Sequence, residues 1–177
     1  MPDSHALGRL EVVAVTPDDW RSHSRLRLDM LRETPDAFWT TYAEVADLDE
    51  WGWRIRIAGQ RHLQARVDGV SVGSVGLWDD PDEQPGTTTL IAMYVVPDAR
   101  RRGVAVRLVQ AVIDDAQRRG QDRVRLEATS SNSPAIELYA RMGFVDTGIR
   151  NPHPRKDDLH ELVMDRPLVA RAPDVEG

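Results

Sequence analysis

The sequence predicts a single α/β domain flanked by two short tails. Segments with the alternation of β-strands and segments with helical periodicity follow one another along the chain. The chain has 177 residues, 41% of them hydrophobic, which suffices for one ordinary core. Charged residues make up 29% and are well mixed, so bulk disorder is disfavoured. We therefore expect a domain at residues 9–166 and tails at residues 1–8 and 167–177.

The N-terminal half is expected to contain a helix with clear start signals and a β-hairpin. Thr16 is a favoured N-cap residue and Pro17 fits the first helical position, so a helix begins here. Asp68-Gly69 is a turn signal typical of two-residue hairpins. The elements expected in this half are a strand at 10–15, a helix at 16–33, a turn near 38–39, a helix at 49–57, and strands at 60–67 and 70–78.

The stretch from Tyr94 to Gly120 is the most informative part of the chain. A strand at 87–96 ends at Pro97, which has no N–H for the ladder, and a basic turn follows. A helix then begins, because apolar residues recur at helical spacing at Ala105, Leu108, Val109, Val112, Ile113 and Ala116. Gly120 stands where a helix C-terminus favours a residue with positive φ.

The basic turn in this stretch predicts a binding site for a phosphate or pyrophosphate. A helix N-terminus presents unpaired N–H groups and the positive end of the helix dipole. Gly103 allows a ligand to approach the backbone, and three arginines (Arg100, Arg101 and Arg102) stand beside it. The turn lacks both the GK[ST] of a Walker loop and the GxGxxG of dinucleotide-binding folds. A solvated basic turn or an RNA contact is the alternative interpretation.

The C-terminal half is expected to hold a strand, a helix and a final pair of strands. The helix has Ser133 as its predicted N-cap, Pro134 at its first position and Gly143 just past its end. The elements expected in this half are a strand at 123–129, the helix at 134–142, and strands at 144–149 and 159–164.

Two segments at this spacing resemble the GCN5-related N-acetyltransferase (GNAT) superfamily. Arg100, Gly103 and Ala105 match the family pattern Gln/Arg-x-x-Gly-x-Gly/Ala in the basic turn. Asn132, Ala135, Tyr139 and the Gly143-Phe144 pair resemble N-x-x-A-x-x-x-Y-x-x-x-GF. The motifs cover residues 88–146 and imply a GNAT-like domain, with a central mixed and splayed β-sheet flanked by about four helices.

The resemblance implies that acetyl-CoA is the co-substrate and assigns residues to its parts. Backbone groups of Met93, Tyr94 and Val95 would pair with the pantetheine arm, and Asn132 would hydrogen-bond this arm. The cofactor pyrophosphate would lie on the turn and the first helical residues, a set that comprises Arg100, Arg101, Arg102, Gly103, Val104, Ala105 and Val106. Asn132 has an alternative role as a turn and cap residue.

Two residues are implied as catalytic. Tyr139 would place its hydroxyl near the thioester sulfur and protonate the departing thiolate; the alternative is a half-buried core tyrosine. Glu127 resembles the general base of the ribosomal-protein N-terminal acetyltransferase branch, in which an L-E strand motif precedes the asparagine by the same spacing. A carboxylate needs burial to raise its pKa for this task. The alternation of its strand also permits a solvent-facing Glu127.

These implications predict an enzyme that transfers an acetyl group to a primary amine by direct attack within a ternary complex. A small-molecule amine or a peptide N-terminus is the expected acceptor, with Glu127 favouring a peptide or small α-amine; the acyl chain is left open. Trp39, Trp51 and Trp53 lie in the region that lines the acceptor pocket in this family, although core packing is the alternative. The rival functions are a non-catalytic acyl-CoA-binding sensor or interaction module, and an RNA-binding protein.

Composition excludes several other classes. The net charge of −6 disfavours a nucleic-acid-binding domain, and the absence of cysteine removes thiolate catalysis, disulfides and Cys-based zinc sites. The five histidines have no metal-ligand spacing, so no metal is expected. No apolar stretch approaches 18 residues and the N-terminus has no apolar signal region, which predicts a cytoplasmic protein without a membrane partner. A homodimer is left open.

Overall fold

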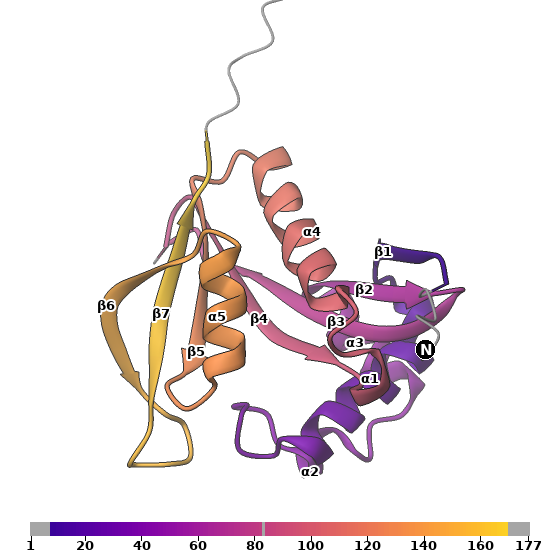
Figure 1. Ribbon diagram of the computed structural model, residues 1–177. Helices are drawn as coiled ribbons and strands as arrows, with labels where there is room; N and C mark the ends of the chain where they lie inside the picture. The colour runs from indigo at the N-terminus through magenta and orange to yellow at the C-terminus, as the bar shows by residue number, and fades with distance from the viewer. Residues whose placement is uncertain (1–7, 83, 170–177) are drawn as a thin grey trace, which may run out of the picture. The chain divides into compact units, whose positions relative to one another are not determined.

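A computed structural model describes residues 8–82 and 84–169 of the chain. The strands are β1 (Leu10–Ala14), β2 (Arg61–Val67), β3 (Val70–Asp79), β4 (Thr87–Val95), β5 (Arg123–Thr129), β6 (Val145–Pro152) and β7 (His160–Pro167). The helices are α1 (Trp20–Glu33), α2 (Tyr42–Val45), α3 (Glu50–Ala58), α4 (Val104–Arg118) and α5 (Ser133–Arg141), with short 3₁₀ helices at Pro17–Asp19 and Pro97–Ala99 (Figure 1). The two predicted tails lie mostly outside the described residues.

The strands form one seven-stranded sheet in the order β1-β2-β3-β4-β5-β7-β6. β4 and β5 run parallel, whereas β1 with β2, β5 with β7, and β7 with β6 run antiparallel. The prediction of an α/β domain with a mixed sheet is confirmed. Within the described residues there are five α-helices, in agreement with the expected number of about four, and the additional one is the one-turn helix α2, which was not predicted. Its start is set by a capping box in which Thr41 and Glu44 satisfy each other's backbone N–H groups.

The chain folds into two compact units, each built from two segments. Of the described residues, unit 1 comprises those up to Gly76 together with Ala92–Leu108, and unit 2 comprises those from Leu77 to Ile91 together with those from Val109 onwards. In the two units taken separately, the boundaries of strands and helices follow the sequence patterns within a few residues.

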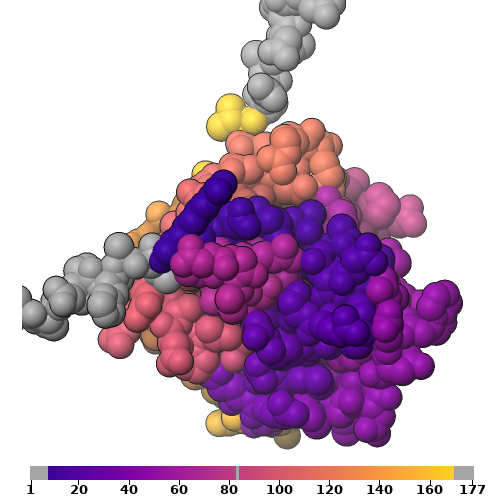
Figure 2. Space-filling model, turned by 90° about the vertical axis from the view of Figure 1, so that its right-hand side faces the viewer, coloured from indigo at the N-terminus to yellow at the C-terminus, as the bar shows by residue number. Residues whose placement is uncertain are grey.

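The core of unit 1 is centred on α1. Leu26, Met30 and Leu31 are fully buried, and their spacing of four and five residues places them on one face of the helix. Val45, Trp53 and Tyr94 complete this cluster from α2, α3 and β4. The N-terminal helices, in indigo and violet, form much of the face of unit 1 that is seen in Figure 2.

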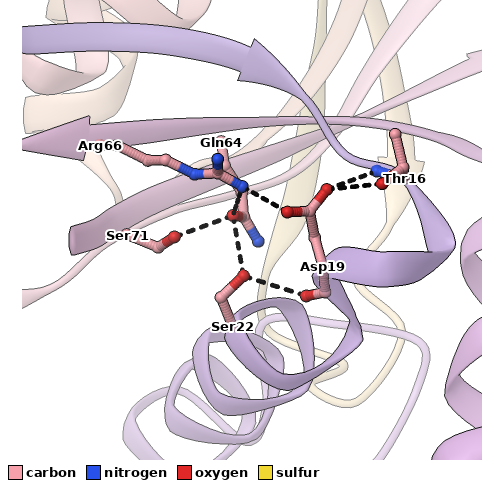
Figure 3. Close-up of polar contacts among 6 residues, drawn as sticks. All are labelled: Thr16, Asp19, Ser22, Gln64, Arg66 and Ser71. Carbon is pink, nitrogen blue, oxygen red and sulfur yellow. Dashed lines mark hydrogen bonds and ion pairs between the residues drawn. The ribbon is translucent and has the colours of Figure 1, made fainter. Parts of the chain in front are cut away.

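A buried polar cluster connects α1 to the hairpin strands β2 and β3 (Figure 3). The Oε1 atom of Gln64, a fully buried residue, accepts hydrogen bonds from Ser71 Oγ at 2.9 Å and from Ser22 Oγ at 3.2 Å. Arg66 forms an ion pair of 2.7 Å with Asp19 just before α1, and Asp19 also accepts from the Thr16 backbone N–H. These contacts are local to unit 1 and fix how α1 lies on the hairpin.

Gly73 of β3 allows the first turns of α4 to pack closely. A Cβ atom at this position would lie 3.0 Å from the Tyr94 carbonyl oxygen, 3.1 Å from Leu108 Cδ1 and 3.3 Å from Val104 Cγ1. Val104 and Leu108 are both buried and stand four residues apart on α4. Glycine is therefore needed here for space, and this close contact fixes the position of the turn that precedes α4.

We expect Gly73→Ala to lower the free energy of unfolding by about 1–3 kcal/mol, the range of overpacked cores. The reason is that a backbone oxygen and two buried side chains must move to admit one methyl group. Urea denaturation followed by circular dichroism measures the change. Gly59→Ala is the matched control, because a Cβ there meets only ordinary contacts, the nearest at 3.5 Å. Equal denaturation midpoints for the two variants would show that Gly73 is not needed for packing.

Unit 2 contains β5, β7 and β6 side by side, together with α5 (Figure 1). On β5 the apolar residues Val124, Leu126 and Ala128 are buried, as the alternation predicts. On the other face Arg125 forms a two-pronged ion pair with Asp165 of β7, with distances of 2.7 and 2.8 Å. β7 extends to Pro167, one residue past the predicted end of the domain.

One predicted cap in unit 2 is wrong. The N-cap of α5 is Asn132, whereas Ser133 is the first residue of the helix. The Asn132 side chain accepts a hydrogen bond of 3.3 Å from the Ala135 N–H. Asparagine and serine are about equally good N-caps, so the two neighbours were not distinguishable by propensity. At the other end of α5 the positive φ of Gly143, 86°, is as predicted.

Candidate functional site

The turn before α4 has the backbone geometry of an anion-binding site. Arg101 and Gly103 adopt positive φ values of 58° and 82°, which turn successive N–H groups in one direction. The first hydrogen bond of α4 runs from the Arg107 N–H to the Gly103 carbonyl at 3.1 Å. The N–H groups of Val104 to Val106 precede this bond and have no acceptor within the helix. They lie beside the exposed Arg101 and Arg102, on the segment that the sequence predicted to bind a phosphate. The binding itself stays a prediction.

Glycine is required at position 103 for its backbone conformation. A Cβ atom added to Gly103 would meet no atom within 4 Å in this structure. Its φ of 82° lies in the left-handed region, which costs L-residues roughly 1–2 kcal/mol. The open space in front of the glycine is what a ligand lying on the backbone needs.

The end of β4 carries a second local irregularity. The register between β4 and β5 runs from Thr87 opposite Arg123 to Leu90 opposite Leu126. Shortly after this register ends, Ala92 adopts a φ of 49°, an unusual value for alanine in a strand. Residues in such conformations often mark functional sites. This one precedes Met93, Tyr94 and Val95, the segment predicted to pair with the cofactor arm.

Arg100 does not extend freely beside the other two arginines of the turn. Its guanidinium forms an ion pair with Glu33 at the end of α1 and donates from Nε to the Val95 carbonyl at 2.9 Å. The same guanidinium lies 5.8 Å from the ring centroid of Tyr94, whose hydroxyl donates to Glu33 at 2.9 Å. Arg100 therefore joins α1, β4 and the turn within unit 1. This role was not predicted, because nothing in the sequence indicated which element would lie beside Arg100.

Burial and the contacts among Arg100, Glu33 and Tyr94 shift the pKa values of Tyr94 and Glu33 in opposite directions. Burial, then the hydrogen bond to Glu33 and its charge, raise the pKa of Tyr94 to about 12. Burial opposes ionisation of Glu33, but the hydrogen bonds from Arg100 and Tyr94 and the Arg100 charge outweigh it and lower the Glu33 pKa. Tyr94 is thus a neutral donor and Glu33 an anion at neutral pH.

Unit 2 contains Asn132 and Tyr139, both on or beside α5. Asn132 is exposed, and its side-chain oxygen caps the helix. Its amide nitrogen has no partner among the described residues, so the capping role leaves this donor free for a ligand. The cap and the predicted cofactor role are compatible, since they use different atoms of the side chain.

Tyr139 is a buried tyrosine with an unpaired hydroxyl. Only 6% of the residue is exposed, and its ring contacts the Phe144 ring edge-on with centroids 5.8 Å apart. Burial raises the pKa of Tyr139 to about 12. Its hydroxyl forms no hydrogen bond with any described residue. The ring of Tyr139 is thus part of the core, while its hydroxyl keeps its hydrogen-bonding capacity available.

Glu127 lies in a carboxylate cluster that the sequence analysis did not foresee. Its side chain is exposed and accepts a hydrogen bond of 2.7 Å from Asn151 Nδ2 on β6. Glu161 of β7 is 8% exposed and lies opposite Thr129, two residues from Glu127, and Glu127 contributes to the raised pKa of Glu161. Finding Glu161 and Asn151 required the register of β5, β7 and β6, which no local pattern in the sequence specifies.

The predicted site residues are divided between the units. All candidates from Met93 to Val106 lie in unit 1, whereas Glu127, Asn132 and Tyr139 lie in unit 2. Of the three tryptophans considered for an acceptor pocket, Trp53 is a core residue at 3% exposure, while Trp39 and Trp51 are exposed. Within residues 8–82 and 84–169 there is no group of three or more potential metal ligands, and no helix could span a membrane.

Comparison with known proteins identifies the family. Residues 28–144, about two thirds of the chain, match the model of the acetyltransferase (GNAT) family. The chain belongs to this family. The resemblance inferred from the two motifs is therefore confirmed.

The relatives of this GNAT chain include enzymes with different acceptors. It is 35% identical over 77 residues to the ribosomal protein bS18-alanine N-acetyltransferase of Escherichia coli, a match that covers 43% of this chain and 52% of the relative. It is 32% identical over 108 residues to an IAA acetyltransferase of Azospirillum brasilense, covering 61% and 68% of the two chains. The chain thus spans about half the length of the first of these relatives.

The fold also matches a solved structure that contains a cofactor. The yncA protein of Salmonella typhimurium, solved with acetyl-CoA, superposes with a TM-score of 0.71 at 21% identity. The match covers 94% of this chain and 98% of that protein. At 21% sequence identity, this match shows a similarity of fold alone.

Proposed function

We propose that this GNAT chain transfers an acetyl group from acetyl-CoA to a primary amine, a small molecule or a peptide N-terminus. The observation that carries the proposal is the turn before α4, in which the positive φ values of Arg101 and Gly103 present backbone N–H groups ahead of a helix. This arrangement suits the pyrophosphate of CoA. Family membership and the acetyl-CoA bound to a protein of the same fold support the choice of ligand.

The cofactor is held mainly through backbone groups in this proposal. The N–H groups from Arg101 to Val106 bind the pyrophosphate, and the backbone of Met93 to Val95 pairs with the pantetheine arm. Arg101 and Arg102 add positive charge, while Arg100 holds the turn against Glu33. The free amide nitrogen of Asn132 donates to the cofactor arm.

The reaction needs no enzyme nucleophile, which agrees with a chain that has no cysteine. The neutral amine attacks the thioester carbonyl, and a backbone N–H in the Met93–Val95 segment stabilises the oxyanion. The carbon–sulfur bond then breaks and the Tyr139 hydroxyl donates its hydrogen to the departing sulfur. A phenol with a pKa of about 12 remains protonated, and hence able to donate, throughout the physiological pH range. Glu127 accepts a proton from the amine.

The test is release of free CoA thiol from acetyl-CoA in the presence of a panel of amines and peptides with free N-termini. We expect thiol release that depends on the amine, with a mass increase of one acetyl group on the acceptor. Binding of acetyl-CoA without thiol release for any amine would instead identify a non-catalytic acyl-CoA-binding module. RNA binding that is salt-dependent and not displaced by acyl-CoA would favour the RNA-binding alternative.

A further inference from the structure

The carboxylate cluster of unit 2 is assembled by three neighbouring strands. In the β5–β7 register Thr129 lies opposite Glu161, and in the β6–β7 register Asn151 lies opposite the same residue. Residues directly opposite each other share a face of the sheet, and so do residues two apart on a strand. Glu127, Glu161 and Asn151 therefore point to one face. Asn151 Nδ2 fixes Glu127 by its 2.7 Å hydrogen bond.

Arg125 interacts electrostatically with Glu127 but forms no ion pair with it, and the charge of Glu127 helps to raise the Arg125 pKa. Among the described residues neither Glu127 nor Glu161 forms an ion pair. Arg125, two residues from Glu127 on β5, is engaged by Asp165 of β7. Asn151 on β6 is neutral, and Thr129 carries no charge. Among the described residues the pair therefore has no directly bound cation, and Arg125, which is bound to Asp165, offsets its charge only from a distance.

Two carboxyl groups in contact do not ionise independently. Burial, followed by the hydrogen bond and the negative charge of Glu127, raises the pKa of Glu161 to about 7. Close to neutral pH the pair therefore alternates between holding one shared proton and holding none. A lone exposed carboxylate is a weak base, whereas a pair that takes up a proton near pH 7 is matched to proton transfer at that pH.

We propose that Glu127 and Glu161 together accept a proton from the ammonium group of the amine substrate. Glu127 faces the amine and Glu161 stores the proton. The proposal rests on the acetyltransferase function proposed above. In the step, the N–H bond of the ammonium breaks, the freed electron pair stays on nitrogen, and the proton passes to the dianionic pair, which becomes a monoanion. The neutral amine then attacks the thioester, and the proton later leaves the pair to solvent.

The same chemistry favours one class of amine. An α-amino group has an ordinary pKa of about 8, and a lysine side chain one of about 10.4. Proton transfer to a carboxyl pair that titrates near pH 7 is unfavourable by roughly 10-fold when the donor is an α-ammonium group. It is unfavourable by over about 1,000-fold when the donor is a lysine ammonium group. The dyad therefore suits α-amines, such as a peptide N-terminus or an amino-acid derivative, better than lysine side chains.

The decisive experiment measures kcat/KM against pH for an α-amine acceptor in wild type, Glu161→Gln and Glu127→Gln. For the wild type we expect kcat/KM to rise with pH through an apparent pKa near 7, in addition to the rise caused by ionisation of the amine itself. Glu161→Gln should shift this rise in kcat/KM to lower pH by more than about one pH unit and lower the maximal kcat/KM about 10-fold. Glu127→Gln should lower kcat/KM by about 10²–10⁴-fold, the range of general-base catalysis. Glu137→Gln is the control, because it removes an exposed carboxylate of α5 that lies at 3.9 Å from Arg141.

The outcomes separate the dyad from the function on which it rests. Absence of acetyl transfer to every amine contradicts the proposed function. Acetyl transfer with coincident pH profiles for wild type and Glu161→Gln overturns the dyad alone, and faster acetylation of a lysine side chain than of an α-amine overturns its substrate class. Carbon-13 NMR of the glutamate carboxyl groups in the wild type gives a test that does not depend on folding of a variant. A carboxyl group that titrates between pH 6 and 8 is expected, and its absence overturns the proposal.

Discussion

Tyr139→Phe should lower kcat by at least about 100-fold while the Kd for acetyl-CoA changes less than about two-fold, since general-acid catalysis contributes roughly 10²–10⁴. The substitution removes only a hydroxyl that has no partner among the described residues, so no protein hydrogen bond is lost. The ring remains packed against Phe144. The departing thiolate, however, loses its hydrogen-bond donor. Steady-state turnover with the best amine found and calorimetric titration of acetyl-CoA measure the two quantities.

The control for this prediction is Tyr42→Phe. That tyrosine also loses a hydroxyl, but one that is hydrogen-bonded to Arg32 at 2.6 Å in the N-terminal helical region. We expect its kcat to stay within about two-fold of wild type. If Tyr139→Phe also turns over at the wild-type rate, Tyr139 is a core residue and the proton for the thiolate comes from elsewhere. A parallel loss of kcat and cofactor affinity would indicate a structural role.

The elements of this fold were predictable where their signals are local. Helical periodicity located α4, start and stop residues located α1 and α5, and a turn signal located the hairpin of β2 and β3, because each of these signals lies within a few residues of sequence. Gly120 has the positive φ value expected from its place after a helix C-terminus, and Gly143 has one as well. α2 was missed because four residues are too short to show a helical period. Its capping box, Thr41 with Glu44, was the only signal that would have located it.

The candidate site residues, whose roles stay predictions, were proposed from signals that are local in the sequence. The residues with backbone roles, from Arg101 to Val106, lie on a continuous segment whose conformation is set by its own sequence. Tyr139 and Asn132 lie on one helix and its cap, so their spacing could be read directly. By contrast, Glu33 is 67 residues from Arg100, and Glu161 is 34 residues from Glu127. Such pairs depend on which elements become neighbours, which is a property of the whole fold.

A second large effect is expected from two neighbouring histidines in unit 1, of which His23 is buried and His62 partly buried. His23 of α1 is 6% exposed, and its ring lies 4.5 Å from that of His62 on β2, centroid to centroid. The Nδ1 atom of His23 has no hydrogen-bond partner among the described residues, and Trp53 packs edge-on against the ring at 6.1 Å. This environment disfavours the charged form of both rings.

The causes of their pKa shifts act in the same direction. Burial, followed by the charges of Arg27 and Arg56, lowers the pKa of His23 from 6.5 to about 4. Burial, followed by His23 and the same two arginines, lowers the pKa of His62 to about 3. Asp19 opposes the shift of His23 but is outweighed. Below pH 6.5 the unfolded histidines therefore bind protons that the folded ones do not, and stability falls as the pH falls towards 4.

The magnitude follows from linkage. At pH 5 each histidine costs about 2 kcal/mol of stability relative to pH 7.5, so the pair costs about 4 kcal/mol, a large share of the 5–15 kcal/mol typical of a domain. Glu161 acts in the opposite direction, because its raised pKa adds stability as the pH falls from 7 towards 4.5. The wild-type curve alone therefore does not isolate the histidines, and a comparison with variants is needed.

His62→Gln should lose stability at pH 7.5, where it disturbs packing, and regain about 2 kcal/mol relative to wild type by pH 5. The reason is that the variant has one group fewer that must stay neutral in the fold, and His23 no longer faces a second ring. Urea midpoints measured at pH 7.5, 6.5, 5.8 and 5.0 give the stability difference at each pH. For His160→Gln, at an exposed position of β7, that difference should stay constant. If the His62→Gln difference is equally flat, protons bind the folded rings as readily as the unfolded ones, and acid lability has another origin.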